Sequence, residues 1–132
     1  MSDDDLNDDI PLPGGDLALQ TMAMPADTNA NGDIFGGWLV SQMDLAGAIA
    51  ALKIAQGRIA TVAINGMVFL TPVHVGAVVS CYADVTEVGR SSIKVSVEVW
   101  IRHKKTQEPT KVTEGDFVFV ALDDSGKTRV IT

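Results

Sequence analysis

The chain has almost no cysteine or histidine. Its 132 residues include one cysteine, Cys81, and two histidines, His74 and His103. A single cysteine excludes an intramolecular disulfide, and the separated histidines lack the spacing of a metal-ligand set. We therefore expect no metal site, and we expect Cys81 to be a small residue of a strand or of the core.

Positive charge is also scarce. The chain carries 10 Lys and Arg against 17 Asp and Glu, a net charge of −7. Six of the acids fall in residues 1–16, so the remaining residues have 11 acids against 10 bases, a net charge of −1. Nucleic-acid-binding surfaces are strongly basic, and the body of this chain is not. We expect no nucleic-acid partner.

The sequence lacks the marks of a secretory or membrane-spanning segment. MSDDDLNDD is acidic where a signal peptide needs a basic region. The longest apolar run, residues 34–52, is interrupted by Gln42, Asp44 and several glycines, which favours a core helix over a membrane span. We expect a cytoplasmic protein with no membrane partner. Residues 1–16, acidic and rich in Pro and Gly, predict a disordered tail before a single domain over residues 17–132.

One carboxylate lies inside that apolar run. Asp44 is the only ionisable residue between Ile34 and Leu52, and a buried carboxylate is costly unless it is paired, hydrogen-bonded or neutralised. At helical spacing, mostly small residues share its side, namely Gly37, Val40, Ser41, Gly47, Ala48, Ala51 and Ala55. Two interpretations stay open. Asp44 is a functional carboxylate in a groove that admits a ligand, or it is a satisfied core acid on a face made small for tight packing.

The rest of the pattern predicts an α+β fold. Residues 17–24 form a first strand, and the helix follows, capped by Asn31 or Asp33 and ending before Gly57. Strands are expected at residues 59–70, 78–88, 92–102 and 117–122, with a bulge or bend at Asn65-Gly66 in the first of these. Short turns between alternating strands make them antiparallel. An apolar helix is hidden on all sides only if the sheet curls around it.

DTNANGDIFGG running into WLVSQMDLAGA resembles hotdog-fold acyl-CoA thioesterases of the single-hotdog YciA type. Further matches are Phe69-x-x-Pro72-x-x-x-Gly76, then Gly89-Arg90-Ser91-Ser92, then the segment FVFVALDDSG at residues 117–126. The resemblance covers about residues 17–130. It implies a curled antiparallel sheet around one long helix, a homo-oligomer built as a trimer of dimers, and active sites at the dimer interface. It implies an acyl-CoA substrate and no cofactor, since coenzyme A is part of the substrate.

The same resemblance implies roles for particular residues. Asp44 matches the general base or nucleophile, Asn29 the residue that positions the reacting group, and Gly37 a backbone N–H facing the thioester oxygen. The residues matching coenzyme A contacts are Gly36, Gly89, Arg90, Ser91 and Ser92. From the residues alone, each also has an ordinary explanation: an Asx-turn, close helix–sheet packing, or a solvated hairpin.

The activity implied is hydrolysis of an acyl-CoA thioester to a free acid and coenzyme A. Two other classes stay open. A non-catalytic acyl-CoA-binding hotdog protein would keep Arg90 without needing a buried Asp44. A hotdog enoyl-CoA hydratase or dehydratase would usually need a His–Asp pair near the helix, and the sequence places neither histidine there.

Overall fold

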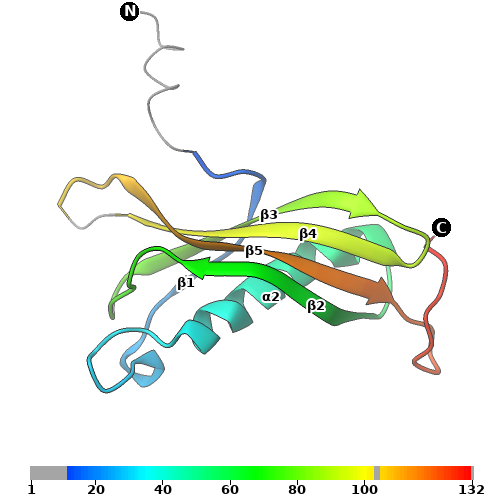
Figure 1. Ribbon diagram of the computed structural model, residues 1–132, viewed down its shortest axis with the longest axis horizontal. Coiled ribbons are helices and arrows are strands. Elements are labelled where there is room, and N and C mark those ends of the chain that lie inside the picture. The colour runs from blue at the N-terminus through cyan, green and yellow to red at the C-terminus, as the bar shows by residue number, and fades with distance from the viewer. Residues whose placement is uncertain (1–11, 103–104, 132) are drawn as a thin grey trace, which may run out of the picture.

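The computed structural model describes residues 12–102 and 105–131, which form one sheet and one long helix (Figure 1). In chain order the elements are β1 (Asp16–Met22), the 3-10 turn η1 (Pro25–Asp27), α2 (Gly36–Ala55), β2 (Ile59–Phe69), β3 (Val78–Val88), β4 (Ser92–Arg102) and β5 (Pro109–Ala121). Of the expected tail, residues 1–11 lie outside the described residues. Residues 12–16 of that segment are described: the N–H of Gly14 donates to the carboxylate of Glu98 at 2.8 Å, and β1 begins at Asp16.

The five strands are ordered β1-β3-β4-β5-β2 and every pair is antiparallel, as expected from the short turns. β3 and β4 have the predicted bounds. The predicted bend in β2 is confirmed, because the register with β5 shifts between Asn65 and Val68 and Gly66 has a φ of +69°. A positive φ is open to glycine at little cost.

β5 begins at Pro109, well before the predicted residue 117. The added residues alternate poorly, so their strand character comes from pairing with β4 on one side and β2 on the other. Lys111 also forms ion pairs with Glu98 and Glu114, at 3.3 and 2.7 Å. A central strand can therefore contain charged residues that sequence periodicity assigns to a loop.

α2 begins at Gly36, so the predicted caps Asn31 and Asp33 are wrong. Phe35 occupies the N-cap, because the preceding residues are held in extended pairings: Asp33 bridges to His74, and the N–H of Ile34 donates to the carbonyl of Val73 at 2.8 Å. Gln56 ends the helix in the left-handed conformation, with φ +50°, one residue before the expected Gly57.

The core lies between the inner face of the sheet and one side of α2, which contacts all five strands. The helix contributes Leu39, Met43, Ala46, Gly47, Ala51 and Ala55, and the sheet contributes alternate residues of β3, β4 and β5. Cys81 is fully buried there, and burial raises the pKa of its thiol to about 12. It is the core residue that the sequence predicted.

The other side of α2 is not covered within one chain. Leu45, Ile49 and Leu52 are 54%, 37% and 44% exposed. The expectation that one sheet hides the helix on all sides therefore holds for one face only. By length and composition α2 would also be able to cross a membrane, but its other face packs on the sheet as that of a core helix does.

Gly47 lets α2 approach the sheet closely. A Cβ at this position would lie 3.0 Å from Cζ of Phe119 and 3.4 Å from Cγ2 of Val97. The small side of the helix thus serves tight packing at Gly47, which was one of the two interpretations of that face.

We predict that Gly47→Ala destabilises the protein. Alanine gains about 0.5–1 kcal/mol in helix propensity, but overpacking a close contact costs about 1–3 kcal/mol. The melting temperature should fall by about 3–5 °C. Gly37→Ala on the same helix is the control, because a Cβ there meets nothing within 4 Å. An equal or higher melting temperature for Gly47→Ala would contradict the packing argument.

Candidate functional site

Asp44 is half-buried on α2, and its partner comes from the neighbouring strand. The hydroxyl of Thr61, on β2, donates to Oδ1 of Asp44 at 2.6 Å. The hydrogen bond fixes one carboxylate oxygen, and Oδ2 has no hydrogen-bond partner in the part of the chain that the structure describes. The carboxylate is therefore oriented, with one oxygen left for another molecule.

Thr61 was missed by the sequence analysis. It was one of many β-branched residues in IATVAINGMVF, and threonine is common in strands. The available signal was its place on the strand: Thr61 pairs with Phe119, so it faces the helix, where the other inward residues of β2 are apolar or small. Only the register of β2 against α2 places it opposite Asp44.

Asn29 lies in the loop before the helix, and its side chain does what an Asx-turn residue does. Its Oδ1 accepts the N–H groups of Asn31 and Asp33, at 2.9 and 3.1 Å. The amide Nδ2 has no partner among the residues described, so the donor end of the side chain stays available. The ordinary explanation of Asn29 and the functional one are therefore compatible.

The two glycines at the start of α2 differ in their surroundings. A Cβ on Gly36 would lie 3.3 Å from the ring of Phe69, so Gly36 allows close packing against β2. A Cβ on Gly37 would meet nothing within 4 Å. The N–H groups of Trp38 and Leu39 both donate to the carbonyl of Phe35, whereas those of Gly36 and Gly37 have no acceptor in the described chain. Such N–H groups attract a negatively charged oxygen.

A pocket of about 390 Å³ opens beside this helix start. Gly36 and Leu39 of α2 line it together with Phe69, the last residue of β2, and with Leu70 and Pro72 just after that strand. Asp44 does not line it. Asp44 is eight residues beyond Gly36, which at 1.5 Å per residue is about 12 Å along the helix. One chain therefore places Thr61 beside Asp44 but keeps both away from Asn29 and Gly37.

The Arg90 turn joins β3 to β4 near the C-terminal end of α2 (Figure 1). The N–H of Gly89 donates to the carbonyl of Ser92 at 2.8 Å and closes the turn. The Arg90 side chain is exposed, and none of the described acids forms an ion pair with it. Its guanidinium group is free to bind an anion, and the half-buried Ser91 and Ser92 lie next to it.

The histidine expectation needs a correction. His74 does form a pair with an acid near the helix: its Nδ1 lies 3.0 Å from Oδ1 of Asp33, three residues before α2. The sequence could not place them together, because the β2–β3 connection brings residue 74 beside residue 33. The His74 side chain is 62% exposed and does not line the pocket at the helix start. The pair holds the Asn29 loop against that connection.

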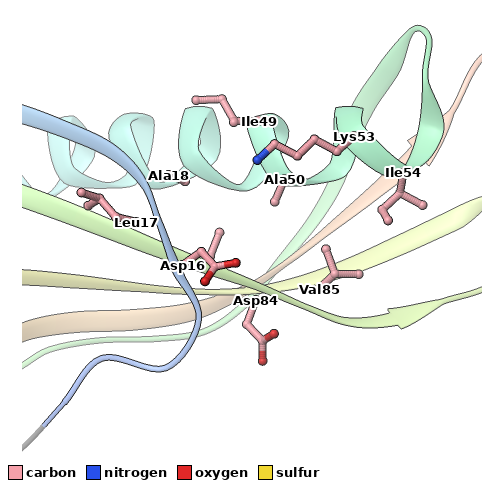
Figure 2. Close-up of a pocket in the computed structure, with 10 residues that line it drawn as sticks. Asp16, Leu17, Ala18, Ile49, Ala50, Lys53, Ile54, Asp84 and Val85 are labelled. Carbon is pink, nitrogen blue, oxygen red and sulfur yellow. The ribbon is translucent and has the colours of Figure 1, made fainter.

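A second pocket, of about 300 Å³, lies further along the helix, between the C-terminal half of α2 and the strands β1 and β3 (Figure 2). Ile49 and Lys53 reach it from α2, Asp16 and Leu17 from β1, and Asp84 from β3. None of the predicted site residues lines this pocket. No group of three or more His, Cys, Asp or Glu able to hold a metal ion occurs in residues 12–102 and 105–131.

Comparison with known proteins gives consistent matches. Residues 31–107 match the family model of the thioesterase superfamily. The chain is 55% identical to the acyl-CoA thioester hydrolase YciA of Escherichia coli (strain K12) over 124 residues, which are 91% of this chain and 93% of that protein.

Two solved structures are similar throughout. The hexameric thioesterase y2039 from Yersinia pestis has a TM-score of 0.87 and 57% identity, covering 92% of this chain and 98% of that one. HI0827, a hexameric broad specificity acyl-coenzyme A thioesterase, was solved as a variant with an aspartate replaced by alanine. It has a TM-score of 0.87 and 52% identity, covering 90% of this chain and 88% of that one.

Proposed function

The chain belongs to the thioesterase superfamily, and from this premise we propose that it hydrolyses acyl-CoA thioesters with Asp44 as the catalytic carboxylate. It is an enzyme, an acyl-CoA thioester hydrolase, and its five-stranded antiparallel sheet around one helix is a hotdog fold. The observation that carries the role of Asp44 is its oriented carboxylate, held at one oxygen by Thr61 and open at the other.

The proposed reaction uses the open oxygen of Asp44. As a general base, Oδ2 takes a proton from water while the water oxygen attacks the thioester carbonyl. The tetrahedral oxyanion accepts hydrogen bonds from the N–H of Gly37 and from Nδ2 of Asn29. The carbon–sulfur bond then breaks, and the departing thiolate takes the proton from Asp44, which leaves a carboxylic acid and coenzyme A. Direct attack by Asp44, through an anhydride that water hydrolyses, is the alternative route.

Two chains are needed to complete this site. Gly37 lies seven residues before Asp44, about 10 Å along the helix, and Asn29 lies in the loop that precedes the helix, so one thioester group cannot reach all three. An apolar surface is also left uncovered: β2 is an edge strand, its Val62 and Val68 are each 57% exposed, and Leu70 just after it is 60% exposed. A long apolar edge pairs readily with another chain. We propose dimers in which one protomer supplies Asp44 and Thr61 and its partner supplies Asn29 and Gly37, assembled as a trimer of dimers.

Arg90 and its neighbours would hold the other end of the substrate. Coenzyme A carries phosphates, and a free guanidinium binds phosphate with charge-assisted hydrogen bonds. Gly89 closes the turn through its N–H, Ser91 and Ser92 would offer their hydroxyl groups to the pantetheine amides, and Gly36 lies beside the pocket at the helix start. No cofactor is needed for this chemistry. We retain residues 17–132 as one catalytic domain in the cytoplasm.

The exposed His74–Asp33 pair keeps a hydratase as the second candidate function. A hydratase would add water across the double bond of crotonyl-CoA without releasing thiol. Hydration of crotonyl-CoA, measured in parallel with thiol release, separates the two activities. Thiol release alone supports the thioesterase, and hydration lost on His74→Ala would support the alternative.

We predict that Asp44→Asn lowers turnover by about 100-fold or more, the loss expected for a general base. Asparagine is nearly isosteric and its Oδ1 can still accept a hydrogen bond from Thr61, so the melting temperature should change little.

Thr61→Val removes the hydroxyl at nearly constant volume and should lower kcat by about 10-fold, since it disturbs only the orientation of the Asp44 carboxylate. Thiol release and thermal melting are measured together. Retained turnover with a melting temperature several degrees lower would make Asp44 a structural acid.

We predict that two inactive variants restore activity when mixed. In a dimer of an Asp44→Asn chain and an Asn29→Ala chain, one of the two shared sites has all its groups. Random exchange of subunits should then recover about one quarter of the wild-type activity. Light scattering should give six times the chain mass of 14.0 kDa. No recovery after proven exchange, or an active monomer, would mean that each chain holds a complete site.

We predict that Arg90→Ala raises KM for acyl-CoA by about 10- to 100-fold, because a charge-assisted hydrogen bond is worth about 1.5–3 kcal/mol. Acyl thioesters of N-acetylcysteamine lack the nucleotide phosphates, so their KM should not change. Arg90→Lys, which keeps the charge, is the matched control, and its KM for acyl-CoA should lie between those of the wild type and Arg90→Ala. An equal loss on both substrates would assign Arg90 to the fold.

A further inference from the structure

The last ten described residues fold back against the end of the molecule that carries the Arg90 turn. After β5, residues 122–131 turn and run beside the β3–β4 turn and the C-terminal end of α2 (Figure 1). Asp123 makes the turn: its carboxylate accepts the hydroxyl and N–H of Ser125 and the N–H of Lys127. These hydrogen bonds, that of the Ser125 hydroxyl foremost, lower the pKa of Asp123.

Arg129 fastens this segment to the helix. Its Nη2 donates to the carbonyl of Ala55, the last residue of α2, at 2.6 Å, and its Nε donates to the carbonyl of Leu122 at 3.1 Å. Its backbone N–H donates to Ala121 at 2.9 Å. The last carbonyls of a helix lack partners within it, and a cation there also suits the helix dipole. Arg129 thus joins the C-terminal segment to α2 through its side chain and to the end of β5 through its backbone.

Two residues later the segment reaches the Arg90 turn. The N–H of Ile131 donates to the carbonyl of Arg90 at 2.8 Å, and the N–H of Ala121 donates to that of Ser91 at 2.8 Å. The backbone of the turn is therefore held by two donors from the C-terminal part of the chain. The Arg90 side chain is left exposed, without an ion pair to any described acid.

We infer that residues 122–131 act as a brace that presents the Arg90 side chain to the phosphates of coenzyme A, with Arg129 and the N–H of Ile131 as its positioning contacts. This inference rests on the proposed phosphate role of Arg90. Neither Arg129 nor Ile131 needs to touch the substrate. Their effect passes through the backbone of the turn.

The test compares Ile131→Pro with Ile131→Ala. Both lose the isoleucine side chain, but only proline lacks the N–H that donates to Arg90. The substrates are butyryl-CoA and butyryl-N-acetylcysteamine. Ile131→Pro should raise KM for butyryl-CoA about 2- to 10-fold over Ile131→Ala, the effect of one neutral hydrogen bond, and should leave the short thioester unaffected.

A double variant shows whether the brace acts through Arg90. If it does, adding Ile131→Pro to Arg90→Ala should cause no further rise in KM for butyryl-CoA, whereas independent effects would multiply. Suppose that Arg90→Ala is selective for butyryl-CoA. If the effects then multiply, or if the two Ile131 variants have equal KM values, the brace is overturned and the phosphate role of Arg90 stands. If Arg90→Ala is not selective, the phosphate role fails and the brace with it.

Arg129→Lys covers the case in which proline prevents folding. Lysine keeps the positive charge but lacks the guanidinium group that binds two carbonyls at once. It should raise KM for butyryl-CoA and not for the short thioester. Lys127→Ala, which removes a cation from the same segment without a described side-chain contact, should change neither. Equal changes on both thioesters in Arg129→Lys would show that the segment only supports the fold.

Discussion

The rest of the molecule depends on one constraint: the apolar surface of α2 is larger than one sheet can cover. The helix is apolar on nearly every side, and the sheet covers only one side. The inner face of the sheet buries Leu39, Met43 and Ala51, while Leu45 and Leu52 stay exposed. At about 25 cal/mol per Å² of apolar surface, such a face favours association strongly. The open edge of β2 supplies backbone groups for the same purpose. The exposed face of the helix thus favours oligomerisation.

The same helix sets the geometry of the site. At its N-terminus the N–H groups of Gly36 and Gly37 have no acceptor in the described part of the chain, and Asp44, fixed by Thr61, lies about 10 to 12 Å further along. A rigid helix cannot bring these two together, which is why the proposed site is shared between two copies of the chain. Under this proposal a chain of only 132 residues binds a substrate as long as acyl-CoA by spreading the reacting groups and the binding turn over more than one chain.

Polar groups in this protein are placed by backbone contacts more than by ion pairs. Asn29 is fixed by accepting two N–H groups of its own loop, and the Arg90 turn by donors from the C-terminal segment. In both residues one part makes the structural hydrogen bonds, and the other part is the one that we propose binds the substrate. A side chain whose orientation is fixed in advance loses less conformational freedom when it binds. This separation of a structural part from a binding part suits the proposed site, where few side chains contact each part of the substrate.

The sequence by itself determined where most of the strands lie and pointed to the residue that we propose as the catalytic carboxylate. Strict alternation set the bounds of β3 and β4, Asn65-Gly66 marked the bend in β2, and one acid in an apolar helix singled out Asp44. Only the tertiary structure decided which groups meet. The N-cap at Phe35, the early start of β5, the His74–Asp33 pair and the bond from Thr61 to Asp44 all depend on register between segments distant in the sequence. Local pattern records how a segment faces the core, but not which residue of another segment lies opposite it.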